Sequence, residues 1–158
     1  MSNLIRLIFL CVVGFYGFVL LSSYFSYIEP YLFPLRMMQG NARYVTENII
    51  IGPYPHESDI KKLIKVEKVR VFISILNPDL PFEGSLVEKE KEVVSRYGAV
   101  FYNVPMGYIR LESPENYRQI RKIREIVRKH AGEKIYIHCY LGRHRVGFVA
   151  ENLIGLVK

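Results

Sequence analysis

The sequence has 158 residues and a formal charge of +7, a length that suits one compact domain with a short accessory segment. No basic run is interleaved with aromatic residues in a stacking pattern, which argues against a nucleic-acid-binding protein. The two cysteines, Cys11 and Cys139, lie far apart in the chain and exclude a disulfide-built scaffold.

Residues 7–28 form an uncharged apolar run that predicts one membrane-spanning helix. At about 1.5 Å per residue such a helix crosses a hydrocarbon layer of about 30 Å, and the aromatic rings at its far end suit the headgroup zone. A cleaved signal peptide is the alternative, although the run is long and lacks a clear small-residue cleavage site. Arg36 and Arg43 follow the run closely and slightly favour a domain on the cytoplasmic face.

The remaining chain alternates short strands with helices. Residues 29–34 predict an interfacial linker, because two prolines forbid a continuous helix there. Ser85 with Glu88 matches a capping box, and Ser113 with Pro114 matches a second helix start. In chain order we expect strands at 43–45 and 48–51, a helix at 55–66, a strand at 69–76, a helix at 85–98, a strand at 99–104, a helix at 113–130 and a strand at 134–138.

This alternation predicts an α/β fold with a mainly parallel central sheet flanked by helices on both faces, preceded by one transmembrane helix. Residues 1–40 form the predicted anchor and linker, and residues 41–158 form the compact domain. In such sheets ligands bind beyond the carboxyl ends of the strands, which is where Cys139 falls.

Cys139, Gly142 and Arg145 share a short loop that separates the last strand from a helix starting near Arg145. Successive N–H groups of such a loop can point inward and bind an anion, and the same field favours the nucleophilic thiolate form of Cys139. Gly142 suits an unusual backbone angle, and the planar fork of Arg145 can hold two oxygens of a phosphoryl group. The pattern therefore predicts attack by sulfur on phosphorus.

The run HCYLGRHR at 138–145 resembles the signature loop of the protein tyrosine and dual-specificity phosphatases, which is His-Cys, five residues, then Arg. The stretch GRHRVG at 142–147 is most similar to the atypical plant and fungal branch, which includes inositol pyrophosphate phosphatases. The resemblance implies that residues 41–158 are a catalytic domain of this type. It implies that Cys139 is the nucleophile, His138 braces the loop, and the phosphate is bound by Tyr140, Leu141, Gly142, Arg143, His144 and Arg145.

The sequence departs from the family pattern at three places. Val146 stands where the family usually has a Ser or Thr that assists departure of the cysteine sulfur. The family's general acid is an aspartate about thirty residues before the cysteine; here only Glu112 lies near that place, 27 residues upstream (139 − 112), with Asp79 as the reserve candidate. The alternatives are a surface or helix-entry role for Glu112 and a turn-forming role for Asp79. The sequence also ends at Lys158, soon after the Arg145 helix, whereas relatives continue with more helix. Either a protein partner completes the core or the family's usual end is dispensable.

These features predict a membrane-anchored, cysteine-dependent phosphatase that acts on a phosphomonoester or pyrophosphate. Its substrate would be a phospholipid headgroup, an inositol phosphate or a phosphoprotein close to the bilayer. The alternative is a catalytically inactive, membrane-anchored phosphate-binding pseudophosphatase, which Val146 and the missing aspartate favour. We expect no cofactor and no metal, because His56 and His130 have no metal-binding neighbours at useful spacing.

Overall fold

The computed structural model of the chain describes residues 3–32 and 38–154. Its core is a five-stranded sheet with the order β1-β2-β5-β3-β4, formed by β1 (Arg43–Tyr44), β2 (Ile49–Gly52), β3 (Val69–Ser74), β4 (Val100–Asn103) and β5 (Lys134–His138). Only β1 is antiparallel to its neighbour; β2, β5, β3 and β4 run parallel. The predicted α/β fold is therefore confirmed.

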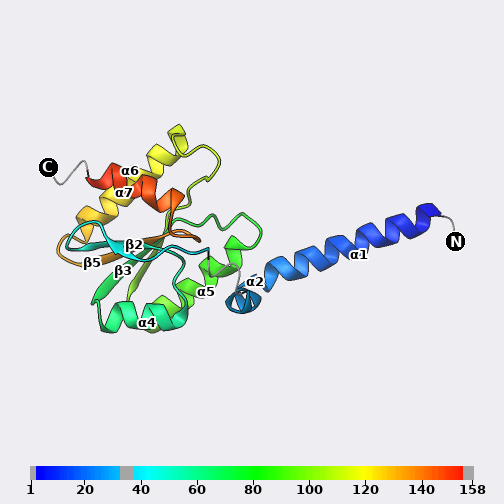
Figure 1. Cartoon of the computed structure of the whole chain (residues 1–158), viewed down its shortest axis with the longest axis horizontal. Coiled ribbons are helices and arrows are strands. Elements are labelled where there is room, and N and C mark those ends of the chain that lie inside the picture. The colour runs from blue at the N-terminus through cyan, green and yellow to red at the C-terminus, as the bar shows by residue number, and fades with distance from the viewer. Residues whose placement is uncertain (1–2, 33–37, 155–158) are drawn as a thin grey trace.

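Helices cover both faces of this sheet, as the near-continuous apolar character of its strands requires (Figure 1). One face carries α4 (Glu57–Lys65) and α5 (Glu83–Arg96), whose Ile60, Val93 and Val94 pack on Phe72. The other carries α6 (Pro114–Lys129) and α7 (His144–Ile154). Because the parallel strands end at one edge, the loops after β3, β4 and β5 meet there.

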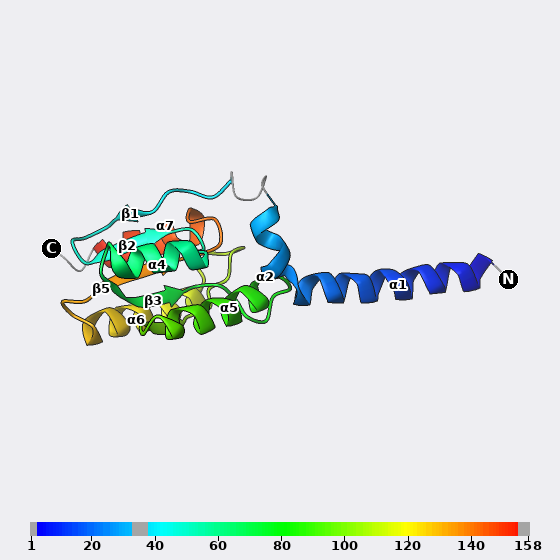
Figure 2. The same ribbon diagram turned by 90° about the horizontal axis from the view of Figure 1, so that it is seen from below.

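The amino-terminal apolar run forms a long helix, α1 (Asn3–Ser23), that projects away from the domain (Figure 2). The helix ends earlier than the predicted residue 28. The chain turns at Tyr24 into the short α2 (Phe25–Ile28) and the 3-10 turn η1 (Glu29–Tyr31). Ser26 and Glu29 are buried against the domain, so the segment after Ser23 packs on protein and does not continue α1. The predicted linker at 29–34 thus begins with an ordered, docked turn, and its residues 33 and 34 lie outside the described part.

Helix α5 begins at Glu83, two residues before the predicted start at Ser85. The Ser85 hydroxyl donates to the Phe82 carbonyl at 3.4 Å, so it does not cap the helix. Gly84 explains the earlier start, because a Cβ there would lie 2.6 Å from the Pro78 carbonyl oxygen. This close approach folds the turn after β3 onto the first residues of α5. The predicted start of α6 is confirmed, since the Ser113 hydroxyl accepts the Asn116 N–H.

Candidate active site

The loop that follows β5 has a conformation that only glycine permits at position 142. Gly142 has φ +68°, and a Cβ there would lie 2.4 Å from the Pro53 nitrogen. Neighbouring segments hold the loop from outside: the Tyr54 N–H donates to the Tyr140 carbonyl at 3.1 Å, and the Gly40 N–H donates to the Leu141 carbonyl at 2.8 Å. Carbonyls of the loop therefore point outward to these neighbours.

The Cys139 sulfur lies on the inner side of this loop. It accepts a hydrogen bond from the Gly142 N–H at 3.2 Å and is almost fully buried. Among the described residues, no group accepts a hydrogen bond from the N–H of Tyr140, Leu141 or Arg143. Amides of such a loop that have no protein acceptor can bind an oxyanion next to the sulfur.

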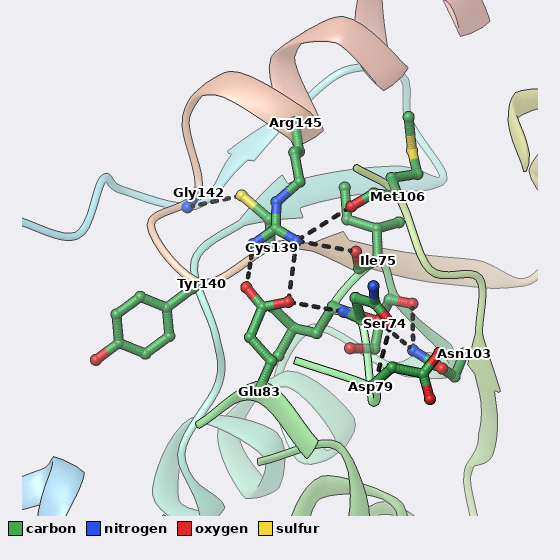
Figure 3. A network of polar contacts seen from close by, with 12 residues as sticks. Ser74, Ile75, Asp79, Glu83, Asn103, Met106, Cys139, Tyr140, Gly142 and Arg145 are labelled. Carbon is green, nitrogen blue, oxygen red and sulfur yellow. Dashed lines mark hydrogen bonds and ion pairs between the residues drawn. The ribbon is translucent and has the colours of Figure 1, made fainter. Parts of the chain in front are cut away.

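Arg145 is held at the site by Glu83, the first residue of α5. Its Nη2 lies 2.5 Å from Glu83 Oε1 and its Nη1 lies 3.1 Å from Glu83 Oε2. Nη1 also donates to the carbonyls of Ile75 (3.3 Å) and Met106 (3.4 Å), beyond β3 and β4 (Figure 3). Arg145 is 7% exposed, and no described residue accepts from its Nε, which leaves that donor for a ligand.

Glu83 is a site residue that the sequence analysis missed. Its Oε2 also accepts the Asn77 N–H at 2.7 Å, so one carboxylate fixes both the turn after β3 and the guanidinium. The only available signal was its place on the segment that connects the carboxyl end of a buried strand to the next helix, where site residues of parallel sheets lie.

His138, the predicted brace of the loop, is fully buried beneath it. Its Nε2 lies 2.7 Å from Oε1 of Glu90, a fully buried α5 residue that the sequence analysis also missed. The imidazole stacks on the Tyr136 ring with the two ring centroids 5.7 Å apart, and the backbone carbonyl of His138 accepts the Ile75 N–H. His138 thus ties the end of β5 to α5 and to the end of β3.

Tyr140, the loop residue after the cysteine, reaches the segment that follows α1. Its hydroxyl donates to Glu29 Oε1 at 2.9 Å, and Glu29 Oε2 lies 3.5 Å from His56 Nε2. Burial raises the pKa of Tyr140, and the nearby Glu29 carboxylate raises it further, so the phenol keeps its proton. The predicted phosphate-binding loop is therefore in direct contact with the segment that follows the apolar run.

The other predicted site residues lie in exposed positions. Arg143 and His144 are exposed at the loop tip. Glu112 is exposed in the loop before α6, and no described residue hydrogen-bonds to its carboxylate. Asp79 is exposed in the turn after β3, where its N–H donates to Asn77 Oδ1 at 3.1 Å. Among residues 3–32 and 38–154, no three His, Cys, Asp or Glu side chains gather as a metal site would require.

The sequence matches no protein-family model and no curated protein sequence, whereas the structure resembles several solved ones. The catalytic core of the PP-IP phosphatase SIW14 from S. cerevisiae is 22% identical, with a TM-score of 0.61 over 75% of this chain and 67% of that chain. Tk-PTP in its active form is 21% identical, with a TM-score of 0.51 over 68% and 67%. PTPMT1 in complex with PI(5)P is 14% identical, with a TM-score of 0.51 over 73% and 80%. The chain has the fold of the cysteine-dependent phosphatases.

Val146 differs from the Ser or Thr that the phosphatase family pattern usually has directly after the arginine. Its side chain is fully buried in the same apolar cluster as Cys139. It offers the sulfur no hydrogen-bond donor, where the family pattern usually places a hydroxyl.

Proposed function

We propose that the chain is a cysteine-dependent phosphatase that hydrolyses a phosphomonoester or a pyrophosphate through a phosphocysteine intermediate. The observation that carries the proposal is the buried Arg145, oriented by Glu83 beside a loop whose inner amides have no acceptor among the described residues. An inert buried cysteine would need neither the anion-binding loop nor a guanidinium at this place.

In the first step the Cys139 thiolate attacks phosphorus, an S–P bond forms, and the bond from phosphorus to the leaving oxygen breaks. Arg145 and the loop amides bind the three non-bridging oxygens and stabilise the charge that develops on them. In the second step water attacks phosphorus, the S–P bond breaks, and inorganic phosphate leaves while the thiolate returns. Val146 donates no hydrogen bond to the departing sulfur, so the second step is the slower one.

The leaving oxygen of a poor leaving group needs a proton in the first step. Glu112 is our first candidate for this general acid and Asp79 the reserve, because both lie on loops at the carboxyl edge of the sheet. Either loop must bring its carboxyl group within hydrogen-bonding reach of the substrate. A pyrophosphate leaves without this help, so a substrate of that class would make the acid dispensable.

The proposal further places α1 across a membrane, with the domain on the cytoplasmic face. Residues Leu4–Ser23 are long and apolar enough to span, and none of that stretch is buried by the domain. The part from Arg43 onward holds 20 of the 22 basic and 14 of the 15 acidic residues, a charge of +6 that favours anionic lipid and phosphorylated substrates. The SIW14 and PTPMT1 likenesses support, as substrate classes, inositol pyrophosphates and phosphorylated lipid headgroups beside phosphoproteins.

Turnover of an aryl phosphate by the full chain in detergent tests the proposal. Cys139→Ser should abolish turnover, while Cys11→Ser, a matched change on the exposed surface of α1, should keep it within about twofold because only one thiol is the nucleophile. Equal turnover by wild type and Cys139→Ser would refute the mechanism. Absent turnover with retained binding of a phosphate analogue would instead favour the inactive phosphate-binding module.

A further inference from the structure

An apolar groove of about 540 Å³ lies between the membrane-proximal helices and the candidate active site. Residues from α1, α2, the turn after β3 and the signature loop contribute to it. Its principal lining residues are Phe18, Phe25, Leu80, Phe82, Tyr108 and Tyr140. A groove of this size and apolar lining is suited to hydrocarbon rather than to a highly charged ligand.

One end of the groove is placed by α1 at the level of the bilayer. The span Leu4–Ser23 has 20 residues, which at about 1.5 Å each matches a hydrocarbon layer of about 30 Å. Phe18 lies five residues before Ser23, and hence about 8 Å inside the end of this span. The Phe82 ring packs edge-on against Phe18 and Phe25, with ring centroids 5.6 Å and 5.0 Å apart. Phe82 therefore lies at the boundary between hydrocarbon and headgroups.

The other end of the groove reaches the phosphate-binding residues. Glu83, which orients Arg145, contributes to its wall, and the Tyr108 ring lies 6.0 Å from the Arg145 guanidinium carbon. Tyr140 is adjacent to Cys139 in sequence, and its ring packs beside the Phe25 ring with centroids 6.5 Å apart. A molecule lying in the groove thus has an apolar end at the bilayer and a polar end beside Glu83 and Tyr108, the two lining residues that contact Arg145.

The geometry points to a phospholipid with a terminal phosphomonoester as the substrate class. Its glycerol backbone and the first methylenes of its acyl chains lie in the groove, and its phosphate reaches Cys139 without the lipid leaving the bilayer. This inference rests on the proposed function and names the substrate of that same site. A soluble phosphomonoester with the same headgroup but no acyl chains would lack the groove contacts and bind more weakly, because it buries no methylene groups.

The position of the groove can be tested without reference to activity. The sequence contains no tryptophan, so Phe82→Trp gives the full chain a single reporter. In nanodiscs of phosphatidylcholine with brominated acyl chains, we expect its fluorescence to fall by about half or more, because bromine quenches on contact and the ring lies at the hydrocarbon boundary. Val66→Trp, at the opposite edge of the sheet, is the matched control and should be almost unquenched. Equal quenching of the two reporters, or none at either, would overturn the placement.

The lipid preference is tested by competition against aryl phosphate turnover in the same discs. Dioleoyl phosphatidic acid and its deacylated counterpart, glycerol 3-phosphate, serve as probes with and without acyl chains. Leu80→Gln places an amide in the groove and should weaken inhibition by the lipid about tenfold more than inhibition by glycerol 3-phosphate. Val66→Gln, also an apolar residue made polar, should change neither inhibition constant.

The inference is wrong if Leu80→Gln weakens both probes equally, or if wild type is inhibited no better by the lipid than by glycerol 3-phosphate. If the full chain does not turn over the aryl phosphate, the proposed function fails. The fluorescence comparison and the binding of both probes to Cys139→Ser still decide whether the groove takes lipid. The two failures are thus distinguishable.

Discussion

Glu83 holds the guanidinium of Arg145 in a two-point ion pair, with Nη–Oε distances of 2.5 and 3.1 Å. The pair joins the start of α5 to the start of α7 across the carboxyl edge of the sheet. Two parallel N–H···O bonds fix the plane of a guanidinium as well as its position. We infer that Glu83 is a positioning residue, which orients the remaining Arg145 donors toward the proposed site beside Cys139.

Replacing Glu83 with Gln should lower kcat/KM for an aryl phosphate about 100-fold, because a guanidinium misplaced by about 1 Å no longer meets the transferring group. The loss should lie mainly in kcat, measured by steady-state kinetics on the solubilised chain. Glu88→Gln, the same change on the exposed side of α5, is the control and should leave both constants close to wild type. Equal kinetics for the two variants would show that Glu83 does not act through Arg145.

Val146→Thr restores the hydroxyl that the family pattern carries next to the arginine. Because that hydroxyl can donate to the departing sulfur, we expect the second step to accelerate and the burst of leaving group to shrink, as followed by stopped flow. Burying a hydroxyl where Val146 is fully buried should cost about 1–3 kcal/mol of stability. An unchanged burst in a folded variant would mean that hydrolysis of the intermediate does not depend on this position.

The general acid can be identified from the dependence on the leaving group. If Glu112 is the acid, Glu112→Gln should slow hydrolysis of phenyl phosphate about 100-fold and that of p-nitrophenyl phosphate much less, since the better leaving group departs without a proton. Asp79→Asn should show no such selectivity. The reverse pattern would assign the acid to Asp79, and a uniform effect of both changes would exclude either residue from proton donation.

The contact between Tyr140 and Glu29 predicts a defined pH dependence of stability. The pKa of Tyr140 is raised above its usual value of about 10, so the native state keeps a proton that the unfolded chain loses there. The contribution of the contact is therefore full below pH about 10 and is lost as pH rises further. Tyr140→Phe should cost about 1 kcal/mol, a modest value for a half-exposed hydrogen bond.

Urea unfolding of the solubilised chain at pH 7, 9 and 11 measures this dependence. We expect the same difference between wild type and Tyr140→Phe at the two lower pH values and a smaller one at the highest. Tyr117→Phe, on the exposed side of α6, controls for the loss of a hydroxyl as such. A difference that grows with pH would contradict the sign of the shift.

The sequence predicts the sheet, its helices and the signature loop well, because each depends on local signals. A few neighbouring residues are enough to predict the apolar strand β5, the turn at Gly142 and the helix cap at Ser113. Local patterns do not predict the partners of the site residues. Glu83, Glu90 and Glu29 hydrogen-bond to residues that lie 48 to 111 positions away in the sequence. Which of the fifteen acidic side chains reaches the site is decided by packing between elements, which no local pattern records.

The same limit explains the two misplaced helix ends. The apolar run continues past Ser23, but the chain turns there because Phe25 packs against Phe82 of the domain. The Ser85 capping signal is present, but Gly84 lets the preceding turn close on Pro78 and start α5 at Glu83. In both cases tertiary contacts override a correct local preference.

The central claim is that the Cys139 sulfur becomes covalently bonded to phosphorus during turnover. Rapid acid quenching of the full chain with a ³²P-labelled aryl phosphate, followed by peptide mapping, tests this most directly. We predict label on the peptide that contains Cys139 in wild type and none in Cys139→Ser. Turnover by wild type with no labelled peptide at any quench time, or label on another residue, would contradict it.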